Sequence, residues 1–260
     1  MSILRSEALL LRSVDFGESD RIVHLLTPGA GRVTAIAKGA RRSVKRFPGT
    51  LDLFNHLHVQ VVHRRKMSMA HLEQATLRCA FLPLRTSAGR FALACYLVEI
   101  IDRLAPEGGS RSETGRLFGF TLRALHMLET SAPDARVRVL LELRALDALG
   151  LRPELRSCVR CGNEVEGPGP VSFVVADGGV LCRRCGPGEG ALPVHLGTLR
   201  ALEQGMRLDL ERLDRLSLPP TSLAESIRLV SRFQRFHLGF EPRSRRFLDE
   251  ILATPGAGVA

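Results

Sequence analysis

Cys158-Val159-Arg160-Cys161 and Cys182-Arg183-Arg184-Cys185 are two Cys-x-x-Cys pairs that twenty residues separate. Each pair can place two thiolates on one tetrahedral ion, and a glycine directly follows the second cysteine of each pair. Between the pairs, Asp177-Gly178-Gly179 is typical of a hairpin turn. The pattern predicts a zinc ribbon at about residues 155–190, with one structural Zn²⁺ bound by Cys158, Cys161, Cys182 and Cys185.

Two other uses of four cysteines stay open, a pair of redox dithiols and an iron–sulfur cluster. Zinc is favoured because the paired spacing suits a closed site of four thiolates, which leaves no coordination position for catalysis. Such a short segment buries little apolar surface, so the ion would supply its folding free energy. The remaining cysteines, Cys79 and Cys95, stand among apolar residues and are predicted to be core thiols.

Helical periodicity surrounds the ribbon. Apolar residues recur at helical spacing over about 91–104, 113–128 and 133–149. Ser222 stands three residues before Glu225, which predicts a capping box at the start of another helix. Gly239 should end that helix, and a last short helix should follow Pro242. We therefore expect residues 81–260 to form a helical domain that carries the ribbon.

The first eighty residues have a different pattern. Short segments of β-strand character alternate with turns, of which Phe16-Gly17-Glu18-Ser19-Asp20 and Pro28-Gly29-Ala30-Gly31 are the clearest. About five short strands without helical periodicity predict a small closed barrel. We assign residues 1–80 to an OB-fold, the class of oligonucleotide-binding barrels, so that the whole chain is α+β.

Basic residues concentrate in this region. The chain carries 37 Lys and Arg against 27 Asp and Glu, a net charge of +10, which favours a polyanionic partner. Residues 38–46 hold five cations and no acid, and a second cluster follows at 64–66. Loops of this kind can track a phosphate backbone, so the predicted DNA-binding residues are Lys38, Arg41, Arg42, Lys45, Arg46, Arg64, Arg65 and Lys66.

The sequence leaves the role of two further features open. Phe47 and Phe54 either stack on bases or belong to the core. A third basic cluster, Arg243, Arg245 and Arg246, either contacts DNA or is a solvated helix end.

The sequence gives no indication of catalysis. None of the three lysines precedes a Ser or Thr, which excludes a Walker A loop, and Gly-x-Gly-x-x-Gly, Gly-x-Ser-x-Gly and His-Glu-x-x-His are absent. We therefore expect a protein that is not an enzyme. No signal peptide and no apolar stretch long enough to span a bilayer is visible, so we expect the cytoplasm and no membrane partner.

Several motifs, in their order along the chain, resemble the bacterial RecO family of recombination and repair mediators. They are the opening hairpin around 16–20 with Leu25-Leu26-Thr27 and Gly31, the basic signature Ala37-Lys38-Gly39-Ala40-Arg41-Arg42, the approach to the first cysteine pair over 146–158, the cysteine pairs themselves, and the ending His237-Leu238-Gly239 with Ser244-Arg245 and Phe247-Leu248.

This resemblance implies binding of single- and double-stranded DNA and annealing of complementary strands. It also implies that, with RecR, the protein helps to load RecA onto DNA coated by single-strand binding protein, in the nucleoid of a bacterial cytoplasm. The acidic, apolar-ended tail of single-strand binding protein would dock on the helical domain. Arg116 and Arg123, one or two turns apart on the predicted second helix, are candidates for that contact.

Two rival functions remain at this point. One is a zinc-ribbon transcription or translation factor that binds nucleic acid; the barrel with its loop at 38–46 argues for the mediator instead. The other is a nuclease or phosphotransferase, which a divalent-metal-dependent cleavage assay would reveal.

Overall fold

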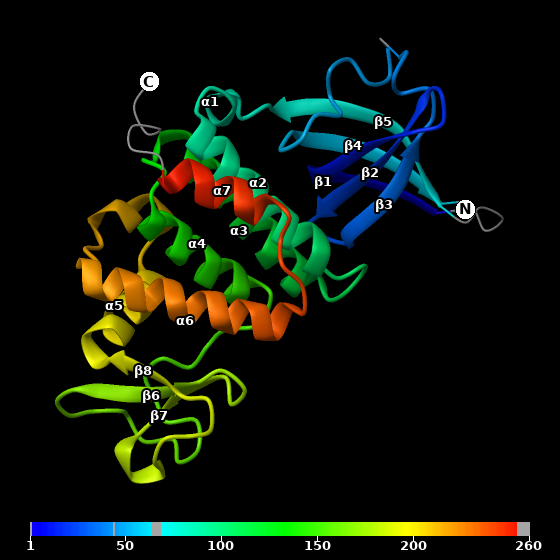
Figure 1. Ribbon diagram of the computed structural model, residues 1–260. Helices are drawn as coiled ribbons and strands as arrows, with labels where there is room; N and C mark the ends of the chain where they lie inside the picture. The colour runs from blue at the N-terminus through cyan, green and yellow to red at the C-terminus, as the bar shows by residue number, and fades with distance from the viewer. Residues whose placement is uncertain (1, 44, 64–68, 254–260) are drawn as a thin grey trace. The chain divides into compact units, whose positions relative to one another are not determined.

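The computed structural model describes residues 2–43, 45–63 and 69–253 (Figure 1). The chain forms two compact units, Met1–Thr130 and Ser131–Ala260. Its described residues place these elements in the first unit: β1 (Ser2–Phe16), β2 (Asp20–Thr27), β3 (Gly31–Ala37), β4 (His56–His63), β5 (Ala70–Cys79), α1 (Leu82–Arg85), α2 (Ala88–Leu104) and α3 (Arg111–Thr130).

The five strands close into a barrel in the order β1-β2-β3-β5-β4. The long strand β1 makes closure possible, since its first half pairs with β4 and its second half with β2, with an irregularity between Leu10 and Arg12. The short parallel pairing of β3 with β5, at Ala35–Ala70 and Ile36–His71, completes the ring. The closed barrel agrees with the sequence prediction for this region.

Alternation along the strands fills the barrel interior with aliphatic side chains. Two residues of the β3–β4 connection, Phe47 and Leu51, also enter this core. Backbone hydrogen bonds from Leu10 N to Asn55 O and from Phe54 N to Leu10 O hold the end of the same connection against β1. The basic segment 38–46 is therefore anchored on both sides, by β3 before it and by Phe47 after it.

Helices α2 and α3 pack on the barrel within the same unit. His24 Nδ1 of β2 lies 2.6 Å from Asp102 Oδ1 of α2, and Arg32 of β3 donates to the Asp102 carbonyl oxygen at 2.9 Å. Asp102 is buried. The compact unit continues to Thr130, fifty residues beyond the predicted barrel boundary at residue 80, and His24 and Arg32 of the barrel find partners on α2.

Up to residue 253, the second unit combines four helices with a small antiparallel sheet of order β7-β6-β8. Its elements are α4 (Ala135–Ala148), β6 (Pro170–Val174), β7 (Gly179–Leu181), the 3₁₀ turn η1 (Arg183–Cys185), β8 (Leu192–His195), α5 (Leu196–Arg207), the 3₁₀ segment η2 (Leu210–Arg215), α6 (Pro220–Leu238) and α7 (Ser244–Ala253). Gly239, with φ +67°, ends α6 as predicted.

The predicted capping box at Ser222 and Glu225 is wrong. Helix α6 begins two residues earlier, at Pro220, because proline suits the first helical position. Glu225 instead accepts hydrogen bonds from Thr198 Oγ1 and His195 N, at 2.6 and 3.2 Å. A reciprocal capping box does exist elsewhere, between Ser110 and Glu113 at the start of α3.

Helix α5 and strand β8 had no predicted counterpart.

Over the residues that the structure describes, none of the helices is both long and apolar enough to cross a membrane.

Candidate metal centre and nucleic-acid interface

The segment predicted to be a zinc ribbon (the ribbon) is built on the β6–β7 hairpin, and the first cysteine pair is tied to it by backbone hydrogen bonds. Val159 N donates to Val180 O at 3.0 Å, and Val180 N donates to Glu154 O at 3.0 Å. The approach is so close that a Cβ on Gly179 would stand 2.6 Å from Val159 Cγ1 and 2.7 Å from Glu154 O. Packing therefore requires glycine at position 179, while the turn before it uses Gly178 at φ +80°.

The hairpin rests on helix α6. Phe173 of β6 and Phe233 of α6 are both buried, and their rings meet edge to face at 6.1 Å. His237 Nε2 lies 3.2 Å from Val175 O. These contacts give the ribbon a fixed base within its unit, which the short sheet could not provide alone.

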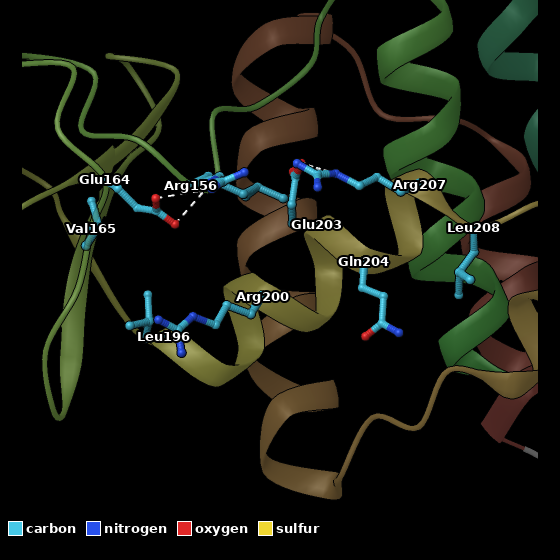
Figure 2. A pocket seen from close by; sticks show the side chains of 10 residues that line it. Arg156, Glu164, Val165, Leu196, Arg200, Glu203, Gln204, Arg207 and Leu208 are labelled. Carbon is cyan, nitrogen blue, oxygen red and sulfur yellow. Dashed lines mark hydrogen bonds and ion pairs between the residues drawn. The ribbon is translucent and has the colours of Figure 1, made fainter.

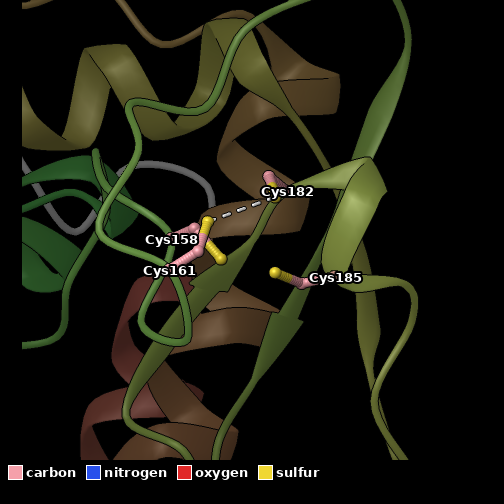
Figure 3. A group of neighbouring side chains, drawn as sticks. All are labelled: Cys158, Cys161, Cys182 and Cys185. Carbon is pink, nitrogen blue, oxygen red and sulfur yellow. Dashed lines mark hydrogen bonds between the residues drawn. The ribbon is translucent and has the colours of Figure 1, made fainter.

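The four predicted ligands converge at the open end of the hairpin (Figure 3). Their sulfur atoms all lie within 4.8 Å of one another, and Cys161 Sγ is 3.7 Å from Cys182 Sγ. Tetrahedral coordination with Zn–S bonds of about 2.3 Å requires neighbouring sulfurs to be about 3.8 Å apart. Gly162 and Gly186, both at φ +74°, reverse the backbone directly after each pair. The four cysteines can therefore hold one metal ion.

The thiols differ in acidity. Burial raises the pKa of Cys158, but backbone N–H groups of Cys182, Arg160 and Cys161 outweigh it, so that the net pKa falls to about 6. Hydrogen bonding with the other three thiols raises the pKa of Cys185 to about 12. Four adjacent thiolates repel one another, and a divalent cation is the group that would let all four ionise.

The cysteines outside the cluster differ in setting. Partial burial raises the pKa of the Cys95 thiol to about 11, although this residue was predicted to lie in the core and is only half-buried on α2. Cys79 is half-buried at the end of β5.

The first basic segment lies at one end of the barrel with its cations in solvent. The side chains of Lys38, Arg41, Arg42, Lys45 and Arg46 are all exposed. Within the described part of the chain, Arg42 and Lys45 make no side-chain hydrogen bond or ion pair. Arg41 and Arg46 have structural contacts as well: Arg41 lies 3.4 Å from Asp15, and Arg46 donates to Lys38 O.

Asp20 orders the start of this segment. Its carboxylate accepts a hydrogen bond from Gly39 N at 2.8 Å, which, together with Ser19 and the nearby Lys38, holds the pKa of Asp20 below its ordinary value. Arg41 N also donates to Ser19 O at 3.0 Å. The turn between β1 and β2 thus supports the basic segment. From the sequence we identified this turn only as a hairpin connection.

The predicted aromatic contacts are resolved in favour of the core. Phe47 is 4% exposed inside the barrel, and Phe54 is fully buried, where its ring meets Phe91 edge to face. Neither ring can stack on a base. The exposed aromatic residue near the basic segment is Phe16, with 52% of its surface accessible.

The other predicted cationic residues form three groups, of which the structure describes two. Arg64, Arg65 and Lys66 lie outside the described residues. Arg116 and Arg123 are exposed on α3, seven residues and so two turns apart on one face.

The C-terminal cluster is interleaved with acids. Arg246 pairs with Glu250 at 3.0 Å, and Arg245 lies 3.4 Å from Glu241 and 3.8 Å from Asp249. Arg243 is exposed beside them. These carboxylates compete with phosphate for the same cations, which makes the cluster a weaker candidate than residues 38–46.

A pocket of about 360 Å³ lies between residues 155–165 of the ribbon and helix α5 (Figure 2). Its arginines face its acids: Arg156 pairs with Glu164 at 3.0 Å, and Arg207 with Glu203 at 2.9 Å. Because most of its charge is paired internally, the pocket presents less cationic surface than the barrel segment does.

Comparison with known proteins identifies relatives over nearly the whole chain. The family described as "Recombination protein O N terminal" matches residues 1–81, and "Recombination protein O C terminal" matches residues 85–246. DNA repair protein RecO of Anaeromyxobacter sp. (strain K) is 38% identical over 258 residues, which cover 99% of this chain and all of the relative. DNA repair protein RecO of Symbiobacterium thermophilum is 36% identical over 256 residues, covering 96% of this chain and 98% of the relative.

Proposed function

The chain belongs to the RecO family of DNA repair proteins, and from this premise we propose that it binds single- and double-stranded DNA and anneals complementary strands. Membership of the family supports a role in DNA repair and recombination. Cationic groups on the chain's own surface support the annealing activity. The observation that carries it is the exposed basic segment 38–46, anchored at the end of the barrel.

Annealing requires two phosphate backbones to approach each other. Exposed guanidinium and ammonium groups replace the condensed counterions of the strands, and the release of those ions drives binding. With the phosphates neutralised, the repulsion between the strands falls and base pairing proceeds without any bond being made or broken. The lack of a Walker A loop is consistent with such a role, so we propose that the protein is not an enzyme.

The barrel is proposed to be an OB-fold. In that class five strands form a small Greek-key barrel whose strand faces and loops bind oligonucleotides. Five strands that close in the order β1-β2-β3-β5-β4, with a basic segment after β3, support this assignment.

We propose Zn²⁺ as the ion of the ribbon. Four thiolates at tetrahedral spacing suit zinc and leave no open coordination position, so the ion would be structural. Cys158, Cys161, Cys182 and Cys185 would hold it, and their turns would tie the two ends of the hairpin together.

The partners are proposed from the family resemblance. With RecR, the protein would help to load RecA onto DNA coated by single-strand binding protein, at the nucleoid in the bacterial cytoplasm. Arg116 and Arg123 remain our candidates for the acidic tail of single-strand binding protein, because both are exposed on one face of α3. Pull-down of that tail by the Arg116→Glu, Arg123→Glu variant would test the assignment.

The central experiment is annealing of two complementary, fluorescently labelled oligonucleotides by the Arg42→Glu, Lys45→Glu variant. We expect the annealing rate to fall at least tenfold. Each lost contact to a single strand should also reduce the slope of log K against log salt by about 0.7. Arg42 and Lys45 are chosen because they make no side-chain contact within the described part of the chain, so their loss should not disturb the segment.

The matched control is Arg212→Glu with Arg215→Glu, which changes the net charge by the same amount on exposed residues of η2. It should anneal at close to the wild-type rate. Equal losses in both variants would mean that only total charge matters. An unchanged salt slope in the Arg42, Lys45 variant would remove the basic segment from the interface.

A further inference from the structure

The outer face of the barrel carries an uncovered apolar strip next to the basic segment. Ser13 pairs with Val23, and Val23 points into the barrel core. Since side chains alternate across a strand, Val14 and Phe16 of β1 point outward. They are 43% and 52% exposed, although both are large apolar residues.

Two neighbouring strands extend this strip. Val14 pairs with Ile22 of β2, and Ile22 pairs with Ile36 of β3, so the three side chains lie in a row across the outer face. Ile22 and Ile36 are half-buried. We call Val14, Phe16, Ile22 and Ile36 the outer strip.

The helices cover this face only in part. Two residues along β2 from Ile22, and on the same face, His24 meets Asp102 of α2 at 2.6 Å. Among the described residues the helical cover therefore begins at His24, and the face is left open toward Phe16, at the end where the basic segment lies.

Asp20 connects the outer strip to the basic segment. Phe16 stands directly opposite Asp20 in the β1–β2 pairing, and directly paired residues have Cβ atoms about 5 Å apart. Asp20 accepts the hydrogen bond from Gly39 N and interacts with Lys38. Through the side chain of Asp20, the Phe16 ring is thus linked to Lys38, the first cation of the basic segment.

We propose that Phe16 is a base-stacking residue, and that the outer strip takes the unpaired bases of a single strand whose phosphates the basic segment neutralises. This inference rests on the proposed DNA binding and deepens it. An apolar face bordered by cations is complementary to a nucleic-acid strand, which offers flat apolar bases along a polyanionic backbone. Paired bases are stacked inside the duplex and cannot use the ring, so Phe16 would favour single strands.

The test compares a short oligothymidylate with an abasic strand of equal length, which keeps the phosphates and lacks the bases. Stacking on an aromatic side chain is worth about 5- to 150-fold in affinity per base. We expect the wild-type protein to prefer oligothymidylate by at least about fivefold. Phe16→Ala should bind both strands with the affinity of the abasic strand and with an unchanged salt slope, because no cation is lost.

A second variant reports on stacking directly. The chain contains no tryptophan, so Phe16→Trp introduces a single indole at the proposed platform. Its emission should be quenched by oligothymidylate and not by the abasic strand. Phe236→Ala is the matched control, since Phe236 is 59% exposed on α6 and lies in the other unit; it should keep the wild-type preference.

The outcomes separate the two proposals. A wild-type protein that binds both strands equally, or a Phe16→Ala variant that keeps the preference, overturns the stacking role and leaves DNA binding intact. So does an indole at position 16 whose emission is unchanged when oligothymidylate saturates the protein. A wild-type protein that binds neither strand at low salt overturns the proposed function itself.

Discussion

Cys158 is subject to two opposite influences on one sulfur atom. Burial raises its pKa, while three backbone N–H groups stabilise the thiolate and lower the pKa to about 6. Backbone amides directed at sulfur are available before any ion arrives, since the turns Cys158-Val159-Arg160-Cys161 and Cys182-Arg183-Arg184-Cys185 supply them. The site is therefore arranged for a cation by its backbone, and metal and protons should compete for it.

Cys182→Ser tests the metal centre at this scale. A hydroxyl is a poor zinc ligand, so we expect the metal content to fall from about one ion per chain to near zero. Elemental analysis of the purified variant measures this. Cys79→Ser, outside the cluster, should keep its metal; a Cys182→Ser protein with full metal content would contradict the assignment.

Phenylalanine shows how far context decides the role of a residue. Phe47 enters the barrel interior, and Phe16, at the end of β1, lies in solvent. Both flank the basic segment, but on sequence grounds Phe47 was a possible base contact and Phe16 was placed only in a turn. Only the exposed ring can contact a base.

At the scale of secondary-structure elements, Glu225 connects β8, α5 and α6. It lies on α6 and accepts hydrogen bonds from Thr198 of α5 and from His195, the last residue of β8. His195 Nδ1 is 2.6 Å from its other oxygen. Burial raises the pKa of Glu225, but these hydrogen bonds outweigh it, and the pKa falls below its ordinary value of 4.5.

Glu225→Gln should therefore destabilise the protein in a pH-dependent manner. A carboxylate whose pKa is lower in the folded state stabilises the fold above its unfolded-state pKa, and the stabilisation is lost as pH falls through the lowered value. We expect a loss of about 1 kcal/mol near neutral pH, allowing for the exposure of His195. Denaturant unfolding at several pH values measures it.

The difference between Glu225→Gln and wild type should shrink as the pH falls below 4.5, the ordinary pKa of the carboxyl. Glu211→Gln, an exposed residue of η2, serves as the control. A difference that stays constant from neutral to acidic pH would show that the carboxylate charge contributes nothing.

The contact between the barrel and the connection that follows α2 belongs to the same scale. Gly31, with φ +64°, begins β3 where a Cβ would collide with the carbonyl oxygen of Pro106. Arg32 N donates to that same oxygen at 2.8 Å. The barrel and its first helices thus share backbone contacts, which is why they form one compact unit.

At the scale of the whole molecule, the two proposed sites lie in different units. The basic segment and the outer strip belong to Met1–Thr130, and the four cysteines belong to Ser131–Ala260. The barrel has its own aliphatic core, and the ribbon rests on α6 of its own unit.

Removing the metal should consequently leave oligonucleotide binding within about twofold of wild type at low salt, because binding there is dominated by phosphate contacts of the first unit. Amide hydrogen exchange should accelerate over residues 158–186 and stay slow in the barrel strands. Both are measured after treatment with a chelator.

Restoring zinc should restore the protection of 158–186. Loss of oligonucleotide binding together with the metal, and its return with zinc, would instead place the ribbon in the DNA interface.

The sequence alone determined the features that depend on short spacing. Two Cys-x-x-Cys pairs around an Asp-Gly-Gly turn can meet at only a few geometries, so the cluster of four cysteines was predictable residue by residue. Helical periodicity identified α2, α3 and α4 to within a few residues, and the order of the motifs indicated the family. Each of these signals is local, since hydrogen bonding within a helix or a turn involves residues a few positions apart.

The tertiary structure decided what depends on distant neighbours. It buried Phe47 and Phe54, exposed Phe16, assigned Glu225 to partners about thirty residues away rather than to a helix cap, and joined α1–α3 to the barrel. Burial and pairing of this kind follow from which surfaces meet when the chain folds, and that depends on contacts whose sequence separation no local pattern records.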